Sequence, residues 1–566
     1  MAPLSSFKIV SGWVILALVP IFYRYPKIRT LVCMLLHAIL SFVLICLDTF
    51  LPLSWLLCLF PRTPSDTITS PRLRYCKRYD WIQSHRSNNV TKLDHFSVQL
   101  EPRENALEPE KEALRSPIVL KYDKTNRENG QRTRATERYF VKCGSAQSRG
   151  LPLWLVALSS YSANREVLFY RRIRPLLRKD VSAPRAILAA EFALLARWCL
   201  VITDLCKGGS FIEYTRNDDE PDALAARLAG PQAQANNRRR KSRSPPRTRQ
   251  TDVRNRFDSY DPNVCRSFVV PDRTGCSLSQ ATAVMNSLAN LHATFYGKAH
   301  LEPALKPLTA PRDSARGYQP APAVALLLKR ALPKLPKMQR LWKMLLASRL
   351  KDATTTMLHG DCRPENLLFH CYGDPANADK GMDGDRNRWQ VSLLDWEAIG
   401  VNPGVNDLVY FITVGLPSKL AADHEEHLIK IYWYHLVRAL GGLPMDARGD
   451  FHDATTKNDS RKNIGPAFAD VQAEYRLMGV VFLIIQACFA TADIFKGWGN
   501  NKRNLVPWMV RLCKFAQRLD VSKTATLLAA EDRAEAKEIL KEMKERASKG
   551  LEKLAEEHGR EVVERY

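Results

Sequence analysis

One segment of the 566-residue chain constrains its fold more than any other. Residues 359–366 read His-Gly-Asp-Cys-Arg-Pro-Glu-Asn, and an apolar run at 391–394 then leads into Asp395. Phosphoryl transfer needs a carboxylate that orients the attacking hydroxyl and accepts its proton, and it needs an amide oxygen and a second carboxylate to hold magnesium. Asp361, Asn366 and Asp395 have side chains of the required kinds, and Asn366 follows Asp361 by five residues.

This segment resembles the catalytic loop of the aminoglycoside-phosphotransferase and choline-kinase superfamily, which reads His-Gly-Asp where protein kinases have His-Arg-Asp. It looks most like the ecdysteroid-kinase-like (CHK kinase-like) branch, and Asp395-Trp396 matches the Asp-Trp pair of the superfamily. The resemblance implies an α+β, protein-kinase-like two-lobe fold with a small antiparallel-sheet lobe and a larger helical lobe. It also implies that Asp361 is the catalytic base, that Asn366 and Asp395 are magnesium ligands, and that His359 fixes the loop.

Upstream segments extend the resemblance. Tyr-Phe-Val-Lys at 139–142 resembles the strand that places a lysine, here Lys142, on the α- and β-phosphates of ATP, and Glu166 lies in a segment like the helix whose glutamate pairs with that lysine. Residues 200–205 resemble the hinge, with Thr203 and Leu205 at the adenine. Gly-Val-Asn-Asp-Leu at 404–408 resembles the segment where the superfamily has a structural aspartate, here Asp407.

Together these features predict an ATP- and Mg²⁺-dependent phosphotransferase acting on a hydroxyl of a small molecule. One segment departs from the pattern. Residues 101–116, where the phosphate-covering loop is expected, contain five glutamates and no glycine, so their backbone cannot approach phosphates closely. The alternative is therefore a membrane-anchored pseudokinase scaffold with weak or no nucleotide turnover.

The N-terminus is apolar. Residues 9–23 and 31–47 carry no charge over 15 and 17 residues, and a basic turn at 24–29 separates them. Each run is slightly short for a span of about 20 residues, which favours a membrane hairpin over two ideal spans. A basic cluster at 62–78 follows and favours the anionic cytosolic leaflet. We expect the chain to be membrane-associated with its kinase-like part facing the cytosol, and a lipophilic alcohol would suit such an acceptor site.

The amino-acid composition indicates which kinds of molecule the chain is expected to bind. Lys and Arg number 84 against 59 Asp and Glu, giving a net charge of +25, which favours anionic partners such as nucleotides or acidic lipid. Residues 238–256 hold nine of the basic residues but lack aromatic interleaving, so nucleic-acid binding is not expected. The 13 cysteines show no Cys-x-x-Cys pair, which argues against a disulfide framework. No pattern in the sequence indicates an oligomeric state.

The pattern divides the chain into six parts. They are a membrane-associated hydrophobic hairpin (1–62), a basic juxtamembrane linker (63–89), a kinase-like small lobe (90–214), a disordered basic insertion (215–262), a kinase-like helical lobe with the catalytic loop (263–522) and a charged C-terminal helix (523–566). Predicted strands lie at 94–100, 117–123, 138–143, 198–205, 366–370 and 390–394. Predicted helices lie at 162–177 and 277–296, around 323–350, through 470–520 and, as a long solvated helix, at 523–565.

Overall fold

The computed structural model describes residues 36, 39–40, 42–43, 90–100, 115–126, 132–145, 165–192, 197–205, 212–213, 265–308, 317–320, 322–372, 389–441, 465–491 and 502–566. They fall into two compact units. Met1–Arg174 with Pro184–Asp204 contains the described strands β1 to β5, and we name it the sheet unit. Pro175–Ala183 with Leu205–Tyr566 contains most of the described helices, and we name it the helical unit.

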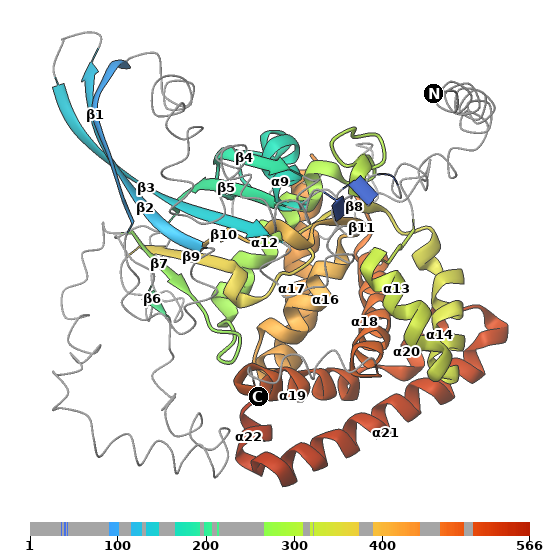
Figure 1. The fold of residues 1–566 in the computed structure, drawn as a ribbon. Coiled ribbons are helices and arrows are strands. Elements are labelled where there is room, and N and C mark those ends of the chain that lie inside the picture. The colour runs from blue at the N-terminus through green and yellow to red at the C-terminus, as the bar shows by residue number, and fades with distance from the viewer. Residues whose placement is uncertain are drawn as a thin grey trace, which may run out of the picture. The chain divides into compact units, whose positions relative to one another are not determined.

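The sheet unit is built on an antiparallel sheet with the strand order β1-β2-β3-β5-β4 (Figure 1). Its strands are β1 (Val90–Leu100), β2 (Arg115–Asn126), β3 (Arg132–Ser145), β4 (Ala186–Phe192) and β5 (Arg197–Thr203). The sequence predicted four of them. It missed β4, because Ala-Ile-Leu-Ala-Ala-Glu-Phe is rich in alanine, which favours helices, and has no strand-like alternation. Pairing with β5 overrides that local preference.

The predicted helix at 162–177 is present but irregular. It begins as α9 (Arg165–Leu168), widens into a π-helical turn, η2 (Phe169–Ile173), and ends as a 3₁₀ turn, η3 (Arg174–Leu176). Val167, Phe169 and Ile173 are buried, and α9 packs on β4 and β5. The helix ends around Pro175, which lacks the N–H that a continuing helix would use.

Two small sheets in the helical unit carry the predicted catalytic segment. One has the order β10-β9-β7-β6 and contains β6 (Ile212–Glu213), β7 (Cys265–Val269), β9 (Leu367–Tyr372) and β10 (Gln390–Leu393). The other pairs β8 (Thr355–Leu358) with β11 (Gly400–Pro403). The two strands predicted at 366–370 and 390–394 are confirmed as β9 and β10, which form an antiparallel pair.

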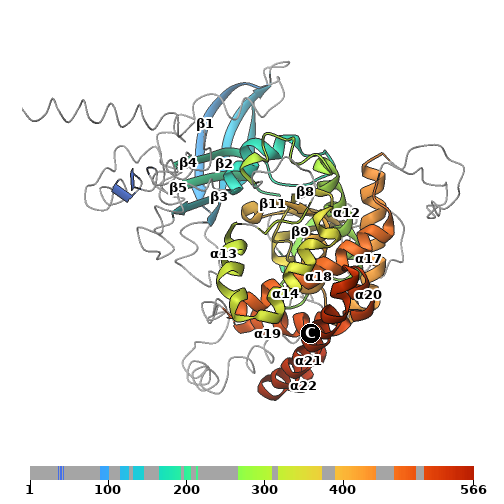
Figure 2. The ribbon, with the colours of Figure 1, turned by 90° about the vertical axis from the view of Figure 1, so that its right-hand side faces the viewer.

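Figure 2 shows the larger helices of this unit beside and below those sheets. They are α12 (Leu278–Phe295), α13 (Pro322–Ala331), α14 (Pro336–Ala347), α16 (Val405–Gly415), α17 (Ser418–Ala439), α18 (Phe468–Thr491) and α19 (Lys502–Arg518). A capping box of Ser277 and Gln280 starts α12 where the sequence predicted it. The helical region around 323–350 is divided, because Pro333 and Pro336 cannot continue a helix begun before them.

Among the described residues, α18 alone is long and apolar enough to cross a membrane. Its most apolar window is 67% buried within the structure. It packs against α13, α14, α16 and α17, and Met478, Val480, Val481 and Ile484 are buried. α18 is therefore a core helix of the helical unit.

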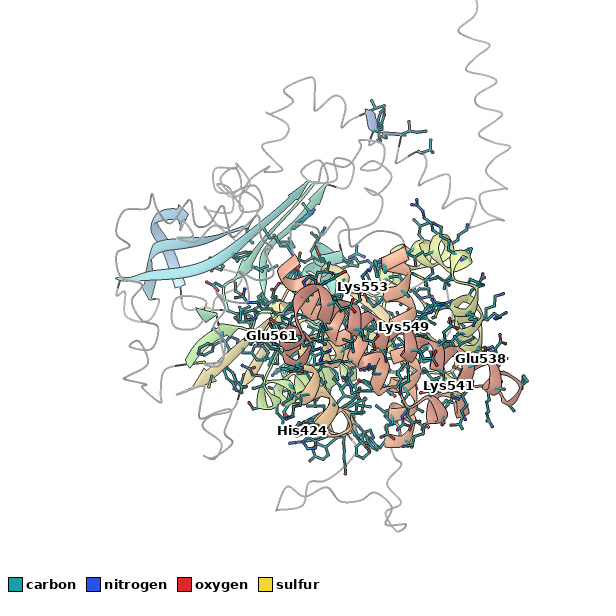
Figure 3. All side chains as sticks on the ribbon, turned by 90° about the horizontal axis from the view of Figure 1, so that it is seen from below. His424, Glu538, Lys541, Lys549, Lys553 and Glu561 are labelled. Atoms are coloured by element: carbon teal, nitrogen blue, oxygen red, sulfur yellow. The ribbon has the colours of Figure 1, made fainter. Side chains whose placement is uncertain are left out.

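The C-terminal segment forms α20 (Val521–Thr526), α21 (Arg533–His558) and α22 (Arg560–Arg565), as its helical pattern predicted. The sequence predicted that this helix is solvated, and this is correct for only one face of α21. Figure 3 shows Glu538, Lys541, Lys549 and Lys553 along α21, and all four are exposed. The opposite face buries Ala536, Ile539, Leu540, Met543 and Ala547, and α21 packs on α14 and α19.

Several predicted segments lie outside the described residues. They are most of the hairpin at 1–62, the linker at 63–89, the insertion at 215–262 and the glycine-free stretch as far as residue 114. Five residues of the second apolar run are described: Leu36, Ile39, Leu40, Phe42 and Val43. They are helical, and each is between 43% and 61% exposed. The hairpin itself stays a prediction.

Candidate active site

The predicted catalytic loop lies between β8 and β9. After Leu358 the chain turns at Gly360, whose φ is 83°, and it reaches Asn366 through a 3₁₀ turn, η9 (Pro364–Asn366). A Cβ at position 360 would overlap the carbonyl oxygen of Ala398. Glycine is therefore required by both its backbone conformation and its neighbour, which explains the Gly of the His-Gly-Asp motif.

Asp407 anchors this loop from the start of α16. Its carboxylate accepts the backbone N–H of His359 at 2.7 Å and that of Gly360 at 2.9 Å. His292 Nε2 lies 3.2 Å from the same carboxylate, and its Nδ1 is 2.9 Å from the hydroxyl of Tyr432. Burial alone would raise the pKa of Asp407, but the hydrogen bond and charge of His292, with His359 and the Gly360 N–H, lower it. The resemblance implied a structural aspartate here, and Asp407 makes the contacts of one.

His359 ties the loop to the segment that carries Asp395. Its Nε2 donates to the carbonyl oxygen of Leu394 at 2.7 Å, and its Nδ1 is 3.4 Å from the backbone N–H of Asp361. In these two contacts Nε2 is the donor and Nδ1 is the acceptor. The ring also packs against Trp396, with 4.7 Å between centroids, and Trp396 is fully buried. The side chain thus bridges the two halves of the predicted site.

Asn366 holds Asp361. Its Nδ2 donates to Asp361 Oδ2 at 2.8 Å and to the Asp361 carbonyl oxygen at 3.0 Å. Because both bonds use the amide nitrogen, Oδ1 is the end of Asn366 that can coordinate a cation. Asn366 is buried, whereas the Asp361 side chain is 25% exposed, and the predicted base needs such exposure to meet a substrate.

The pairing of β9 and β10 brings Asn366 near Asp395. Leu367 is paired with Leu393, and the Leu394 N–H donates to the Asn366 carbonyl oxygen at 2.9 Å. Asp395 is the next residue, with φ 58° and ψ 69°, and among the described residues it is the single non-glycine with a positive φ. No trio of His, Cys, Asp or Glu that could hold a metal occurs in the described part of the chain. One amide oxygen and one carboxylate nevertheless fit Mg²⁺, which usually takes few protein ligands and completes its shell with phosphates and water.

Sequence reasoning missed two residues that contact Asp361. The Tyr410 hydroxyl donates to Asp361 Oδ1 at 2.7 Å, and Arg363 Nε lies 3.4 Å from Oδ2. Tyr410 is 49 residues from Asp361 in sequence, so no local spacing pointed to it. A usable signal was its place three residues after Asp407, because residues i and i+3 share a helix face.

Arg363 also connects Asp361 to an acidic pair. Its Nη1 lies 3.3 Å from Asp272 and 3.4 Å from Glu365. Burial, and then the charge of Glu365, raise the pKa of Asp272 to about 6, although Arg363 opposes this. Arg511 is buried below the cluster and donates to the Asp272 carbonyl oxygen at 2.6 Å. The loop beside the predicted base is therefore fixed by charged groups on both sides.

In the sheet unit, the predicted ion pair between Lys142 and Glu166 is present. Lys142 Nζ on β3 lies 2.6 Å from Glu166 on α9, and both residues are at least 95% buried. Thr203 ends β5, where its backbone N–H donates to Arg185 at 2.8 Å and its hydroxyl accepts the Arg185 N–H at 3.0 Å. The backbone N–H of Thr203 is therefore already used in a hydrogen bond to the carbonyl oxygen of Arg185. Leu205 follows two residues later and begins the second segment of the helical unit.

Comparison with known proteins gives one sequence match. The model of the ecdysteroid kinase-like family matches residues 324–445, a segment that contains the whole catalytic loop, Asp395 and Asp407. A search of curated proteins found no match.

Solved structures give distant likenesses. Choline kinase LicA from Streptococcus pneumoniae is 9% identical, with a TM-score of 0.31, and the match covers 76% of this chain and 94% of that one. The GDP complex of wild-type aminoglycoside 2'-phosphotransferase-IIIa is 9% identical, with a TM-score of 0.31, and the match covers 84% of this chain and 99% of that one. A microcompartment-associated aminopropanol kinase is 11% identical, with a TM-score of 0.26, and the match covers 85% of this chain and 97% of that one. The family match covers the same residues whose contacts form the catalytic loop. Over residues 324–445 the chain resembles the ecdysteroid kinase-like family, as the His-Gly-Asp motif predicted.

Proposed function

We propose that the chain is an ATP-dependent phosphotransferase that acts on a hydroxyl of a small molecule. The observation that carries the proposal is the arrangement around Asp361: a partly exposed carboxylate held by Asn366, with Asp395 on the adjoining strand end. The family match over the same segment supports it.

Each residue then has a chemical role. Asp361 orients the acceptor hydroxyl and takes its proton while the acceptor oxygen bonds to the γ-phosphorus and the bond from that phosphorus to ADP breaks. Asn366 Oδ1 and the Asp395 carboxylate would hold Mg²⁺, which when bound neutralises charge on the phosphates. Lys142 would contact the α- and β-phosphates, with Glu166 fixing its side chain.

Replacing Asp361 with Asn tests this function. We expect Mg²⁺-dependent phosphate transfer from ATP to fall by about 10²–10⁴-fold, because an amide cannot accept the proton. The full chain should first be assayed with a panel of alcohols, amino alcohols and sterols to find an acceptor. Thermal melting and the affinity for Mg²⁺·ATP should stay near those of the parent, since the amide fills the same volume. Equal turnover by the two proteins would contradict the assignment.

A second candidate, a pseudokinase scaffold, is favoured by one feature: the absence of glycine from residues 101–116. This function predicts that the parent chain shows no Mg²⁺-dependent ATP binding and no transfer to any acceptor. The kinase function predicts both. Calorimetric titration of the full chain with ATP, with and without Mg²⁺, therefore separates the two functions before an acceptor is known.

We also propose that the N-terminal segment attaches the chain to a membrane, with the kinase-like part in the cytosol and a lipophilic alcohol as its acceptor. The two uncharged runs and the basic residues that follow support this location, as does the exposure of Leu36, Ile39 and Phe42. Residues 1–62 fused to a soluble reporter should sediment with membranes. In sealed microsomes, protease should digest the C-terminal part of the full chain without detergent. Residues 89–91 read Asn-Val-Thr, a sequon for N-glycosylation. Full protection, or a glycan on Asn89, would place that part in the lumen.

A further inference from the structure

The carboxylate of Asp361 is held at both of its oxygens by different parts of the chain. Asn366, from the catalytic loop itself, donates to Oδ2 at 2.8 Å. The hydroxyl of Tyr410, from α16, donates to Oδ1 at 2.7 Å. Two hydrogen bonds on opposite oxygens fix the rotation of the carboxylate about its Cβ–Cγ bond, which a single bond would leave free.

Tyr410 is itself held in place. Its ring contacts Phe482 of α18 and Trp508 of α19 edge-on, with centroids 5.7 Å and 5.9 Å away. Burial, and then the charge of Asp361 and the bond to it, raise the pKa of Tyr410 well above its usual value. The phenol is therefore a neutral donor over the whole physiological range. It can give a hydrogen bond to the carboxylate, but it cannot add a competing negative charge.

Two residues on one face of α16 therefore form hydrogen bonds to the catalytic loop. Asp407 accepts the backbone N–H groups of His359 and Gly360, and Tyr410, three residues later, donates to the side chain of Asp361. The first contact sets the path of the loop backbone. The second sets the direction of its reactive side chain.

We propose that Tyr410 is a positioning residue for the base Asp361; this rests on the function proposed above. The hydroxyl holds the carboxylate in the orientation that receives the acceptor proton. A purely structural role would require only the aromatic ring, which packs between Phe482 and Trp508. Tyr410→Phe separates the two roles because it removes one oxygen and keeps the ring.

Tyr475→Phe is a matched control. It removes the same atom from a buried tyrosine of the same unit, whose hydroxyl donates to Glu425 at 2.5 Å and makes no contact with Asp361. Any general effect of deleting a buried hydroxyl should appear in both variants. An effect on Asp361 should appear in Tyr410→Phe alone.

The first measurement follows Asp361 directly and needs no turnover. Crystal structures of the parent and of both variants report the rotation of the Asp361 carboxylate about its Cβ–Cγ bond. We expect this rotation to change in Tyr410→Phe, because the hydrogen bond to Oδ1 is lost while the bond from Asn366 to Oδ2 remains. In Tyr475→Phe it should match the parent. An unchanged carboxylate in Tyr410→Phe would overturn the proposal.

The second measurement is steady-state kinetics with Mg²⁺·ATP. We expect kcat of Tyr410→Phe to fall by about tenfold and the KM for ATP to stay unchanged, whereas Tyr475→Phe should keep both values of the parent. An unchanged kcat in Tyr410→Phe would also overturn the role. If the parent shows no transfer while the carboxylate of Asp361 rotates in Tyr410→Phe, the proposed kinase function fails and the positioning of Asp361 by Tyr410 stands.

Discussion

At the scale of single residues, Asp395 combines backbone strain with a predicted metal ligand. Its φ of 58° and ψ of 69° lie in the left-handed region, which costs a non-glycine residue about 1–2 kcal/mol. Aspartate is tolerated there better than most residues, but glycine would fit without strain. A strained residue persists only where the surrounding structure holds it, and such residues concentrate at functional sites. The carboxylate, rather than stability, therefore explains an aspartate at this position.

Two substitutions at position 395 separate strain from chemistry. Both Asp395→Gly and Asp395→Ala should abolish Mg²⁺-dependent ATP binding, because each removes an oxygen ligand from a hard cation. Their stabilities should differ: Asp395→Gly should be more stable than Asp395→Ala by about 1 kcal/mol, since only glycine relieves the strain. Urea denaturation and calorimetric titration measure the two effects. Equal stability of the two variants would argue against strain, and parental ATP binding by both would place the metal elsewhere.

At the scale of elements, the sequence predicted those whose signals are local. Ser277 and Gln280 mark the start of α12 within one turn, and the apolar stretch of α18 shows a core helix directly. β4 carries no such signal, because its alanines form a strand only by pairing with β5. The burial of one face of α21 was also missed. The charges at i,i+4 spacing show a helix, but the partners α14 and α19 lie elsewhere in the sequence.

The residues of the candidate site also divide into those with a local sequence signal and those that only tertiary packing brings together. Asp361, Asn366 and Asp395 were found because their spacing is fixed by one loop and one strand pair. Asp272 and Tyr410 were missed, because tertiary packing brings them to that loop across 93 and 49 residues. Lys142 and Glu166 are an intermediate case. The resemblance suggested their pairing, which the buried contact between β3 and α9 confirms, although a four-residue helix such as α9 cannot be stable by itself.

At the scale of the whole molecule, buried acids set how stability depends on pH. Burial, and then the charge of Asp470, raise the pKa of Glu474 to about 7 against the opposing charge of Arg349. The pKa of Asp272 is raised to about 6. A carboxyl group whose pKa is raised by folding contributes stability that is fully present below its unfolded pKa, near 4, and is lost as the pH rises through the folded value. Asp407 acts in the opposite direction: its lowered pKa stabilises the fold above about pH 4, and this contribution is lost in stronger acid.

The protein should therefore be more stable near pH 5 than near pH 8, and Glu474→Gln should remove part of that difference. At pH 8 the parent holds a partly buried charge that the glutamine variant lacks, so the variant should be more stable by about 2 kcal/mol. At pH 5 the side chain of Glu474 is neutral in the folded protein and ionised only in the unfolded chain, so the advantage of the variant should be smaller than at pH 8. Glu538→Gln on the exposed face of α21 is the control and should follow the parent at both values. Urea denaturation at pH 5 and pH 8 measures this, and equal stability of Glu474→Gln and the parent at pH 8 would show that Glu474 carries no such cost.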